Sequence, residues 1–166
     1  MCEMKKIFIT GLLIILFFIL DNALVPFFAI GNYYPSILFV FIVCFSIVNG
    51  RWQGLWVGAL SGMLQDIFFY NTFGINSLLN MLVCVIAGAI GINIFKEKKL
   101  IPMISTLGLS ALKGLGIFFV LLILGQHTNI NNIFINASYE MIICVFMYRT
   151  VYKLYYKNFM KKDWKF

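Results

Sequence analysis

The sequence predicts an all-α integral membrane protein, a bundle of six transmembrane helices, and three observations support this fold class. Mean hydropathy is +0.95 over the 166 residues. Only 11% of the residues are charged, whereas a soluble domain has about 25%. Six apolar runs have roughly the length that a helix needs to cross the ~30 Å hydrocarbon core of a bilayer. No stretch is left for a soluble domain, so we expect residues 1–166 to form one membrane domain.

The six expected spans follow from the order of these runs. The first run follows Lys5 and Lys6 and continues past Asp21 without a small-residue cleavage pattern, which favours a retained helix over a secretion signal. Five connections separate the runs in order: GNYYP, the turn at 49–51, YNTFGIN, the basic KEKK and GQHTNINN. The expected spans are 7–28, 34–48, 52–70, 75–95, 100–124 and 133–152, and residues 153–166 form a basic cytoplasmic tail.

Positive charges fall on one side of the expected bundle. With the N-terminus in the cytoplasm, every lysine and arginine except Lys113 lies at a terminus or in an inner loop. Because such residues stay on the cytoplasmic side, we expect both ends of the chain there. The net charge of +7 then faces anionic lipid headgroups. No compact soluble fold presents it to nucleic acid, so we expect no nucleic acid partner.

Catalytic and metal-binding patterns are missing from the sequence. The single histidine, His127, has no cysteine or carboxylate nearby at metal-ligand spacing, and no glycine motif for phosphates is present. Cys44, Cys84 and Cys144 lie in apolar runs without CxxC spacing, so we interpret them as small buried hydrophobic residues. We therefore expect no enzyme and no cofactor. A scaffold, a substrate-binding transport subunit and a small channel remain.

Four charged residues fall inside the apolar runs, where each costs roughly 2.5 to 3.5 kcal/mol on insertion scales. Counted at ~1.5 Å per residue, all four lie about 20 Å from the cytoplasmic side of the membrane. Amide side chains fall near the same depth, in the outer half of the bundle. The expected intramembrane polar belt consists of Asp21, Asn22, Gln65, Asp66, Asn76, Asn80, Lys113 and Glu140.

The belt has three acids and one base, so a single ion pair cannot neutralise it. Either one acid is protonated or water reaches the layer. Three interpretations remain open: a hydrogen-bonded network that orders the bundle, a ligand or ion pocket open to the exterior, and a charged interface with a partner helix. Lys113 and Glu140, at one depth on neighbouring spans, are expected to pair directly or through water.

A stripe of glycines leads to one of the acids. The stripe runs through Gly54, Gly58, Gly62 and Asp66. Residues four apart follow one face of a helix with a drift of ~40° per step. Small residues let a second helix approach closely, and in lipid such packing drives association. We expect the stripe to hold the fourth span and to bring Asp66 to the donors Asn76 or Asn80.

A family resemblance lies in residues 54–91, GLWVGALSGMLQDIFFYNTFGINSLLNMLVCVIAGAIG. This segment resembles the rod shape-determining protein MreD family, which has Gly-x-x-x-Gly-x-x-x-Asp in a membrane helix, then an outer loop, then a helix ending in small residues. The run YPSILFVF, 34–41, is similar to the proline-led start of the family's second helix. Matching positions are Gly58, Gly62, Asp66, Gly74, Asn76, Leu78 and Gly88. The loop departs at 71–73, where many members have a proline.

The resemblance implies a non-catalytic scaffold of the cell-elongation machinery, in the bacterial inner membrane. It would bind MreC and help couple MreB filaments to the glycan polymerase and transpeptidase that build lateral peptidoglycan. The expected helix-packing or partner interface consists of Gly54, Gly58, Gly62, Gly74 and Gly88. The family is similar in fold to substrate-binding subunits of energy-coupling factor transporters, so a vitamin-type subunit with an outward-open pocket is the alternative.

Overall fold

The computed structural model describes residues 2–23, 35–68, 74–92, 100–125 and 131–155. Its helices are α1 (Cys2–Ala23), α3 (Ile37–Asn49), α4 (Arg51–Phe68), α5 (Ile75–Ile92), α6 (Leu100–Ile123) and α7 (Asn131–Tyr152). The all-helical class predicted from the sequence is confirmed for these residues. α1 starts earlier than expected, at Cys2, and α3 starts later, at Ile37. The expected span ends at 24–28, 69–70 and 93–95 lie outside the described residues.

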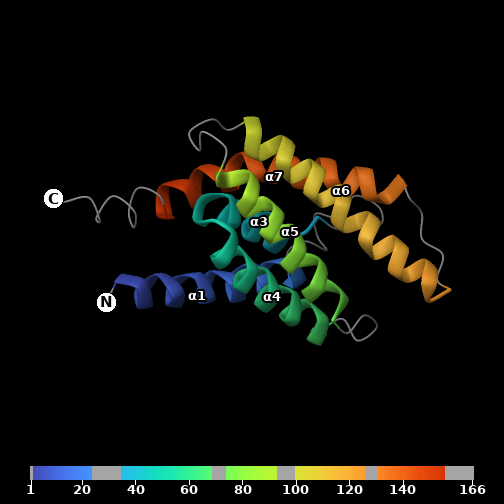
Figure 1. The fold of residues 1–166 in the computed structure, drawn as a ribbon, viewed down its shortest axis with the longest axis horizontal. Coiled ribbons are helices and arrows are strands. Elements are labelled where there is room, and N and C mark those ends of the chain that lie inside the picture. Colours follow the sequence, from blue (N-terminus) through green and yellow to red (C-terminus); the bar gives the residue numbers. More distant parts are fainter. Residues whose placement is uncertain (1, 24–34, 69–73, 93–99, 126–130, 156–166) are drawn as a thin grey trace.

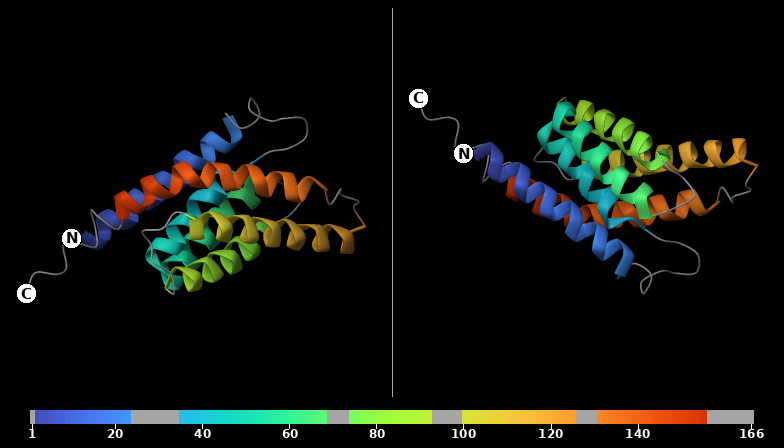
Figure 2. Two further views of the ribbon diagram at one scale, coloured as in Figure 1. Left: turned by 90° about the horizontal axis from the view of Figure 1, so that it is seen from above. Right: turned by 90° about the horizontal axis from the view of Figure 1, so that it is seen from below.

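Successive helices alternate in direction, so the start of α1 and the end of α7 lie at the same end of the molecule (Figures 1 and 2). α4 also starts at this end. Basic residues mark it, with Lys6 near the start of α1, Arg51 at the start of α4, and Arg149 and Lys153 at the end of α7. We refer to it as the basic end of the bundle.

α3 forms the centre of the bundle and packs against each of the other five helices. Every residue from Leu38 to Val48 is buried, as expected of a helix that is apolar on all sides. Its 13 residues give a length of about 20 Å, shorter than the ~30 Å hydrocarbon core. Because α3 ends at the basic end of the bundle, it starts at membrane depth.

The outer surface of the bundle is that of a protein surrounded by lipid. Among the residues that the structure describes, three helices are long and apolar enough to cross a membrane, over Lys6–Ala23, Ile75–Ile92 and Ile101–Ile123. Large apolar side chains point outward, including Phe8 and Phe146, which are 74% and 77% exposed. A soluble monomer rarely carries such a surface. The six-span topology stays a prediction, since α3 is short and α4 and α7 are more polar than those three helices.

α4 and α5 pack most closely, and the glycine stripe on α4 is the reason. Gly58 and Gly62 face α5, and Gly54 lies between α5 and α3, against Cys84 and Ser46. A Cβ atom on Gly58 would lie 2.7 Å from the Asn80 carbonyl oxygen, and one on Gly62 would overlap the Ser77 backbone. Since backbone atoms cannot move aside as a flexible side chain can, only glycine permits this approach.

Glycines of α5 and of the turn before it have different roles. A Cβ atom on Gly88 would lie 2.6 Å from the Arg51 nitrogen, so Gly88 packs against the turn between α3 and α4. Gly91, which the sequence analysis did not single out, packs against Ile47. Gly74 was expected at the helix-packing or partner interface, but among the described residues nothing lies within 4 Å of a Cβ atom there. Its φ of +87° explains the glycine.

Candidate functional site

The polar residues inside the bundle gather at the starts of two helices, α3 and α5. The first four N–H groups of any helix have no acceptor within that helix. In water they bind solvent, but in hydrocarbon each unsatisfied group costs several kcal/mol. Both helix starts therefore need side-chain acceptors, and acidic residues from other helices provide them.

Asp21, near the end of α1, binds the start of α3. Its Oδ1 accepts a hydrogen bond from the Ile37 N–H at 2.7 Å, and its Oδ2 accepts one from the Leu38 N–H at 3.1 Å. Oδ2 also accepts the Ser36 hydroxyl at 2.8 Å. One carboxylate thus satisfies two backbone donors and orients the serine that precedes the helix.

Glu140 of α7 completes this arrangement from the opposite side. Its Oε1 accepts the Ser36 N–H at 3.2 Å, and its Oε2 accepts the hydroxyl of Ser110 from α6. The Ser36 hydroxyl oxygen accepts the Phe39 N–H at 3.1 Å, the usual bond of an N-cap serine. We call this group of Asp21, Ser36, Ser110 and Glu140 the α3 cap. It joins α1, α3, α6 and α7 at one point.

The α3 cap explains how two acids are stabilised without a cationic partner for each. A helix start carries roughly half a positive charge from its aligned peptide dipoles. Hydrogen bonds from N–H groups to a carboxylate are about twice as strong as those between neutral groups. The positive end of α3 therefore takes the place of a second base, which the sequence analysis could not identify.

Asp66 binds the start of α5 in the same way. Its Oδ1 accepts the Asn76 N–H at 3.1 Å and the Asn76 side-chain amide at 3.0 Å, and its Oδ2 accepts the Ser77 N–H at 2.9 Å. We call Asp66, Asn76 and Ser77 the α5 cap. Of the two donors named from the sequence, Asn76 binds Asp66, whereas Asn80 donates to Gln65 Oε1 at 2.9 Å.

Lys113 does not make the direct ion pair that was expected. Lys113 and Glu140 form no salt bridge within 4.0 Å among the residues that the structure describes. Instead, the Lys113 ammonium lies over the Phe39 ring, 4.5 Å from its centroid, a cation–π contact. The Glu140 oxygens are directed at the α3 cap, where they accept hydrogen bonds from Ser36 and Ser110.

The remaining belt residue, Asn22, takes no part in either cap. Its side-chain amide donates to the Phe18 carbonyl within α1 at 2.9 Å. The Phe18 ring lies 4.9 Å from the Phe68 ring, centroid to centroid. The ends of α1 and α4, which carry Asp21 and Asp66, therefore lie beside each other.

Three serines were missed by the sequence analysis. Ser36 had a recognisable signal, since a serine directly before an apolar run is a common N-cap. Ser77 donates its hydroxyl to the Ala59 carbonyl of α4 at 3.2 Å, and Ser110 binds Glu140. Neither has a sequence signal that distinguishes it from other serines in apolar helices.

Cys44, Cys84 and Cys144 are buried, so their interpretation as small buried residues is confirmed. The Cys44 and Cys144 sulfur atoms lie 3.6 Å apart, and the Thr106 hydroxyl lies 3.1 Å from the Cys144 sulfur. These contacts join α3, α6 and α7 below the α3 cap.

The two caps hold helices together, and their geometry offers little to a ligand. All six oxygens of Asp21, Asp66 and Glu140 accept hydrogen bonds from the chain itself. In the described part of the chain, no group of three histidine, cysteine or acidic residues could hold a metal ion. The interpretation that the geometry supports is the hydrogen-bonded network that orders the bundle.

Comparison with known families gives one match. The family described as rod shape-determining protein MreD matches residues 4–158, from the first turn of α1 to beyond the end of α7. Both caps lie within the matched residues. No curated protein and no solved structure matches the chain.

Proposed function

The chain belongs to the rod shape-determining protein MreD family, and from this membership we propose that it is a non-catalytic membrane scaffold of the bacterial cell-elongation machinery. Membership assigns it a role in rod shape determination. The finer proposal is that the chain binds MreC and helps to couple MreB filaments to the glycan polymerase and transpeptidase of the lateral wall. The family match over residues 4–158 is the observation that carries the proposal.

The two caps support a scaffold over a catalyst. An acid or nucleophile that takes part in a reaction needs an oxygen or a proton within reach of a substrate. The intramembrane acids of this chain instead accept hydrogen bonds from N–H groups at the starts of α3 and α5. Such bonds fix the positions of helices, which is what a scaffold requires.

We place all six helices in the inner membrane, with both ends of the chain in the cytoplasm. The alternation of helix directions (Figure 1) and the four basic residues at one end of the bundle support this topology. Reporter fusions after residue 166 and between α6 and α7 test it. We expect a cytoplasmic signal from the first and an external signal from the second, and an external C-terminus would contradict the topology.

The alternative function, a vitamin-type binding subunit, makes different demands on the purified protein. Such a subunit should copurify with a small molecule, whereas a scaffold should copurify with MreC. The satisfied oxygens of Asp21, Asp66 and Glu140 favour the scaffold, because a polar ligand would have to displace bonds to backbone N–H groups.

Depletion in a rod-shaped bacterium that depends on this chain tests the cellular role. We expect rounded cells with misplaced wall synthesis, and unchanged uptake of vitamins. A variant carrying Gly108→Leu serves as a control, because nothing lies within 4 Å of a Cβ atom at Gly108, and it should restore rod shape. Normal rods after verified depletion would contradict the proposal.

A further inference from the structure

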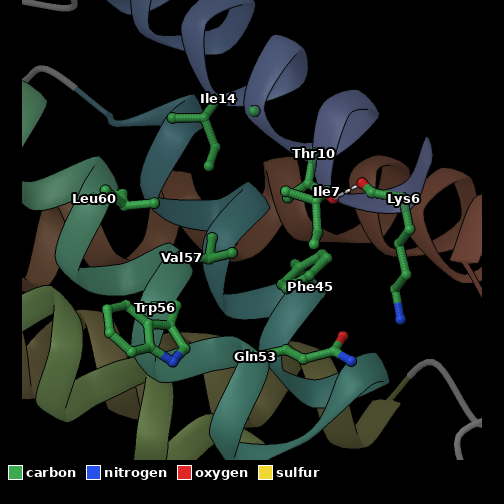
Figure 3. Close-up of a pocket in the computed structure, with 10 residues that line it drawn as sticks. Lys6, Ile7, Thr10, Ile14, Phe45, Gln53, Trp56, Val57 and Leu60 are labelled. Carbon is green, nitrogen blue, oxygen red and sulfur yellow. Dashed lines mark hydrogen bonds between the residues drawn. The ribbon is translucent and has the colours of Figure 1, made fainter. Parts of the chain in front are cut away.

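A groove of about 410 Å³ lies between α1 and α4, away from both caps (Figure 3). Lys6 and Gln53 lie toward one end of the groove, and Ile14 and Leu60 lie toward the other. Between them the lining is largely apolar, with Val57 and other aliphatic or aromatic side chains. The groove is thus polar at one end and apolar along its length.

The polar end lies at the level of lipid headgroups. Lys6 is the first residue of the apolar window of α1, which extends to Ala23. In the first two turns of α4, Trp52 and Trp56 are 76% and 64% exposed. Tryptophans exposed in this way are enriched where a membrane meets water. From this level the groove extends along α1 and α4 into the hydrocarbon.

The second polar group at this end of the groove is the side chain of Gln53. Its side-chain oxygen is buried and has no hydrogen-bond partner among the described residues. Buried polar atoms in proteins nearly always have a partner. A hydroxyl group arriving from outside the chain, beside the ammonium of Lys6, would supply one.

The lining of the groove suits a lipid chain. Its polar groups Lys6 and Gln53 lie at one end, and aliphatic and aromatic side chains extend from there, in the order of a headgroup followed by its chain. A single acyl chain has no backbone to accommodate and can extend from the headgroup level toward Ile14 and Leu60.

We propose that the groove binds one acyl chain of an anionic glycerophospholipid, with the phosphate at Lys6 and a headgroup hydroxyl at Gln53. The cytoplasmic leaflet as the source of this lipid rests on the topology proposed above. Charge favours an anionic headgroup, since Lys6 is the one charged residue among the described residues that line the groove. A bound lipid would hold α1 and α4 at a fixed separation.

The first test fills the groove. Nothing lies within 4 Å of a Cβ atom at Gly11, which lines the groove, so Gly11→Leu adds volume there without overlapping the chain. Gly108→Leu on α6 is the matched control, because that glycine is also helical and open. Each protein is reconstituted in phosphatidylcholine vesicles containing a minor fraction of phosphatidylglycerol, extracted gently, and examined by native mass spectrometry. We expect one retained phosphatidylglycerol in the wild type and in Gly108→Leu, and none in Gly11→Leu.

The second test removes the charge. Lys6→Gln should lower the preference for phosphatidylglycerol over phosphatidylcholine about fivefold, the effect of one basic residue near a headgroup. Lys153→Gln is the control, because Lys153 is exposed at the end of α7, and it should leave the preference unchanged. If Lys6→Gln does not fold, Gln53→Leu tests the same end of the groove and should also weaken retention.

Three results would overturn the inference. Retention of lipid by Gly11→Leu at the wild-type level would show that the groove is not the site. Equal retention of the two lipids by the wild type would exclude an anionic headgroup. Loss of MreC copurification in Gly11→Leu with lipid retention unchanged would identify the occupant as a partner helix. The lipid measurements use the isolated chain, so their failure is distinguishable from failure of the proposed scaffold function.

Discussion

Both caps provide acceptors for N–H groups at the start of a helix, but they connect residues at very different separations in the sequence. In the α5 cap, Asp66 binds residues 10 and 11 positions further along. In the α3 cap, Asp21 binds residues 15 to 17 positions away, and Glu140 binds Ser36 across 104 positions. The α5 cap can therefore form as soon as α4 and α5 pair. The α3 cap requires that α1, α6 and α7 have already packed around α3.

This difference assigns the caps different structural roles. The α5 cap fixes the register of one helix pair, which the glycines of α4 already hold closely together. The α3 cap fixes the relative positions of four helices, and α3 itself is buried on all sides. Disturbing the α5 cap should therefore loosen one pair, whereas disturbing the α3 cap should loosen the whole bundle.

The largest expected effect comes from Gly62→Leu, which breaks the helix pair beneath the α5 cap. A side chain at residue 62 would overlap the backbone of Asn76 and Ser77, and backbone atoms cannot rotate away as a side chain can. Overpacking of this kind costs about 3 kcal/mol or more of the free energy of unfolding. We expect little folded protein in the membrane, measured by extraction and size-exclusion chromatography, with Gly108→Leu near the wild-type amount. Wild-type levels of folded Gly62→Leu would contradict the close α4–α5 contact.

A second, smaller effect distinguishes the two caps. Asp66→Leu and Asp21→Leu each leave two part-buried backbone N–H groups without an acceptor. Each such group costs about 1 to 3 kcal/mol. We expect both variants to lower the free energy of unfolding in mixed micelles by roughly 2 kcal/mol or more, while Asp66→Asn, which keeps one acceptor oxygen, costs about 1 kcal/mol.

The contrast between the caps should appear in a local measurement of the same variants. Hydrogen exchange should rise mainly in α4 and α5 for Asp66→Leu, because its contacts are confined to that pair. For Asp21→Leu it should rise in α1, α3, α6 and α7 together. An exchange pattern confined to α1 and α3 in Asp21→Leu would show that the α3 cap does not couple the four helices.

Sequence reasoning found the Asp66–Asn76 contact of the α5 cap but missed Ser77, and it missed the partners of both acids in the α3 cap, for a physical reason. The glycine stripe predicts which helix lies against α4, and so it brings Asp66 to the start of α5 and to Asn76. Lys113 and Glu140 were instead paired by depth and charge, and Asp21 was assigned only to the polar belt, because a sequence shows directly where the ionisable side chains are. A sequence does not show which backbone N–H groups lack an acceptor, although here such groups are partners of both Asp21 and Glu140.

The length of α3 was the other feature that hydropathy alone could not provide. An apolar run shows that a segment avoids water, but burial among five helices and contact with lipid produce the same composition. Pro35 and Ser36 mark where the helix starts, and that boundary places the α3 start at membrane depth. Once the boundary is known, the need for Asp21 and Glu140 follows from the unsatisfied N–H groups.

The smallest expected effect concerns Lys113, the one base at membrane depth that the sequence paired with Glu140. The structure places its ammonium over the Phe39 ring, in the first turn of α3. A cation–π contact of this kind contributes about 0.5 to 2 kcal/mol, with the higher value where water is excluded. Lys113→Met keeps most of the apolar stem and removes the charge, and Phe39→Leu removes the ring face while keeping an apolar side chain. In a double-mutant cycle of the free energy of unfolding in mixed micelles, we expect a coupling of about 1 kcal/mol between these two changes. Additive effects of Lys113→Met and Phe39→Leu would show that the cation–π contact does not stabilise the fold. The interaction of Lys113 with the acids of the α3 cap would then be the next contribution to measure.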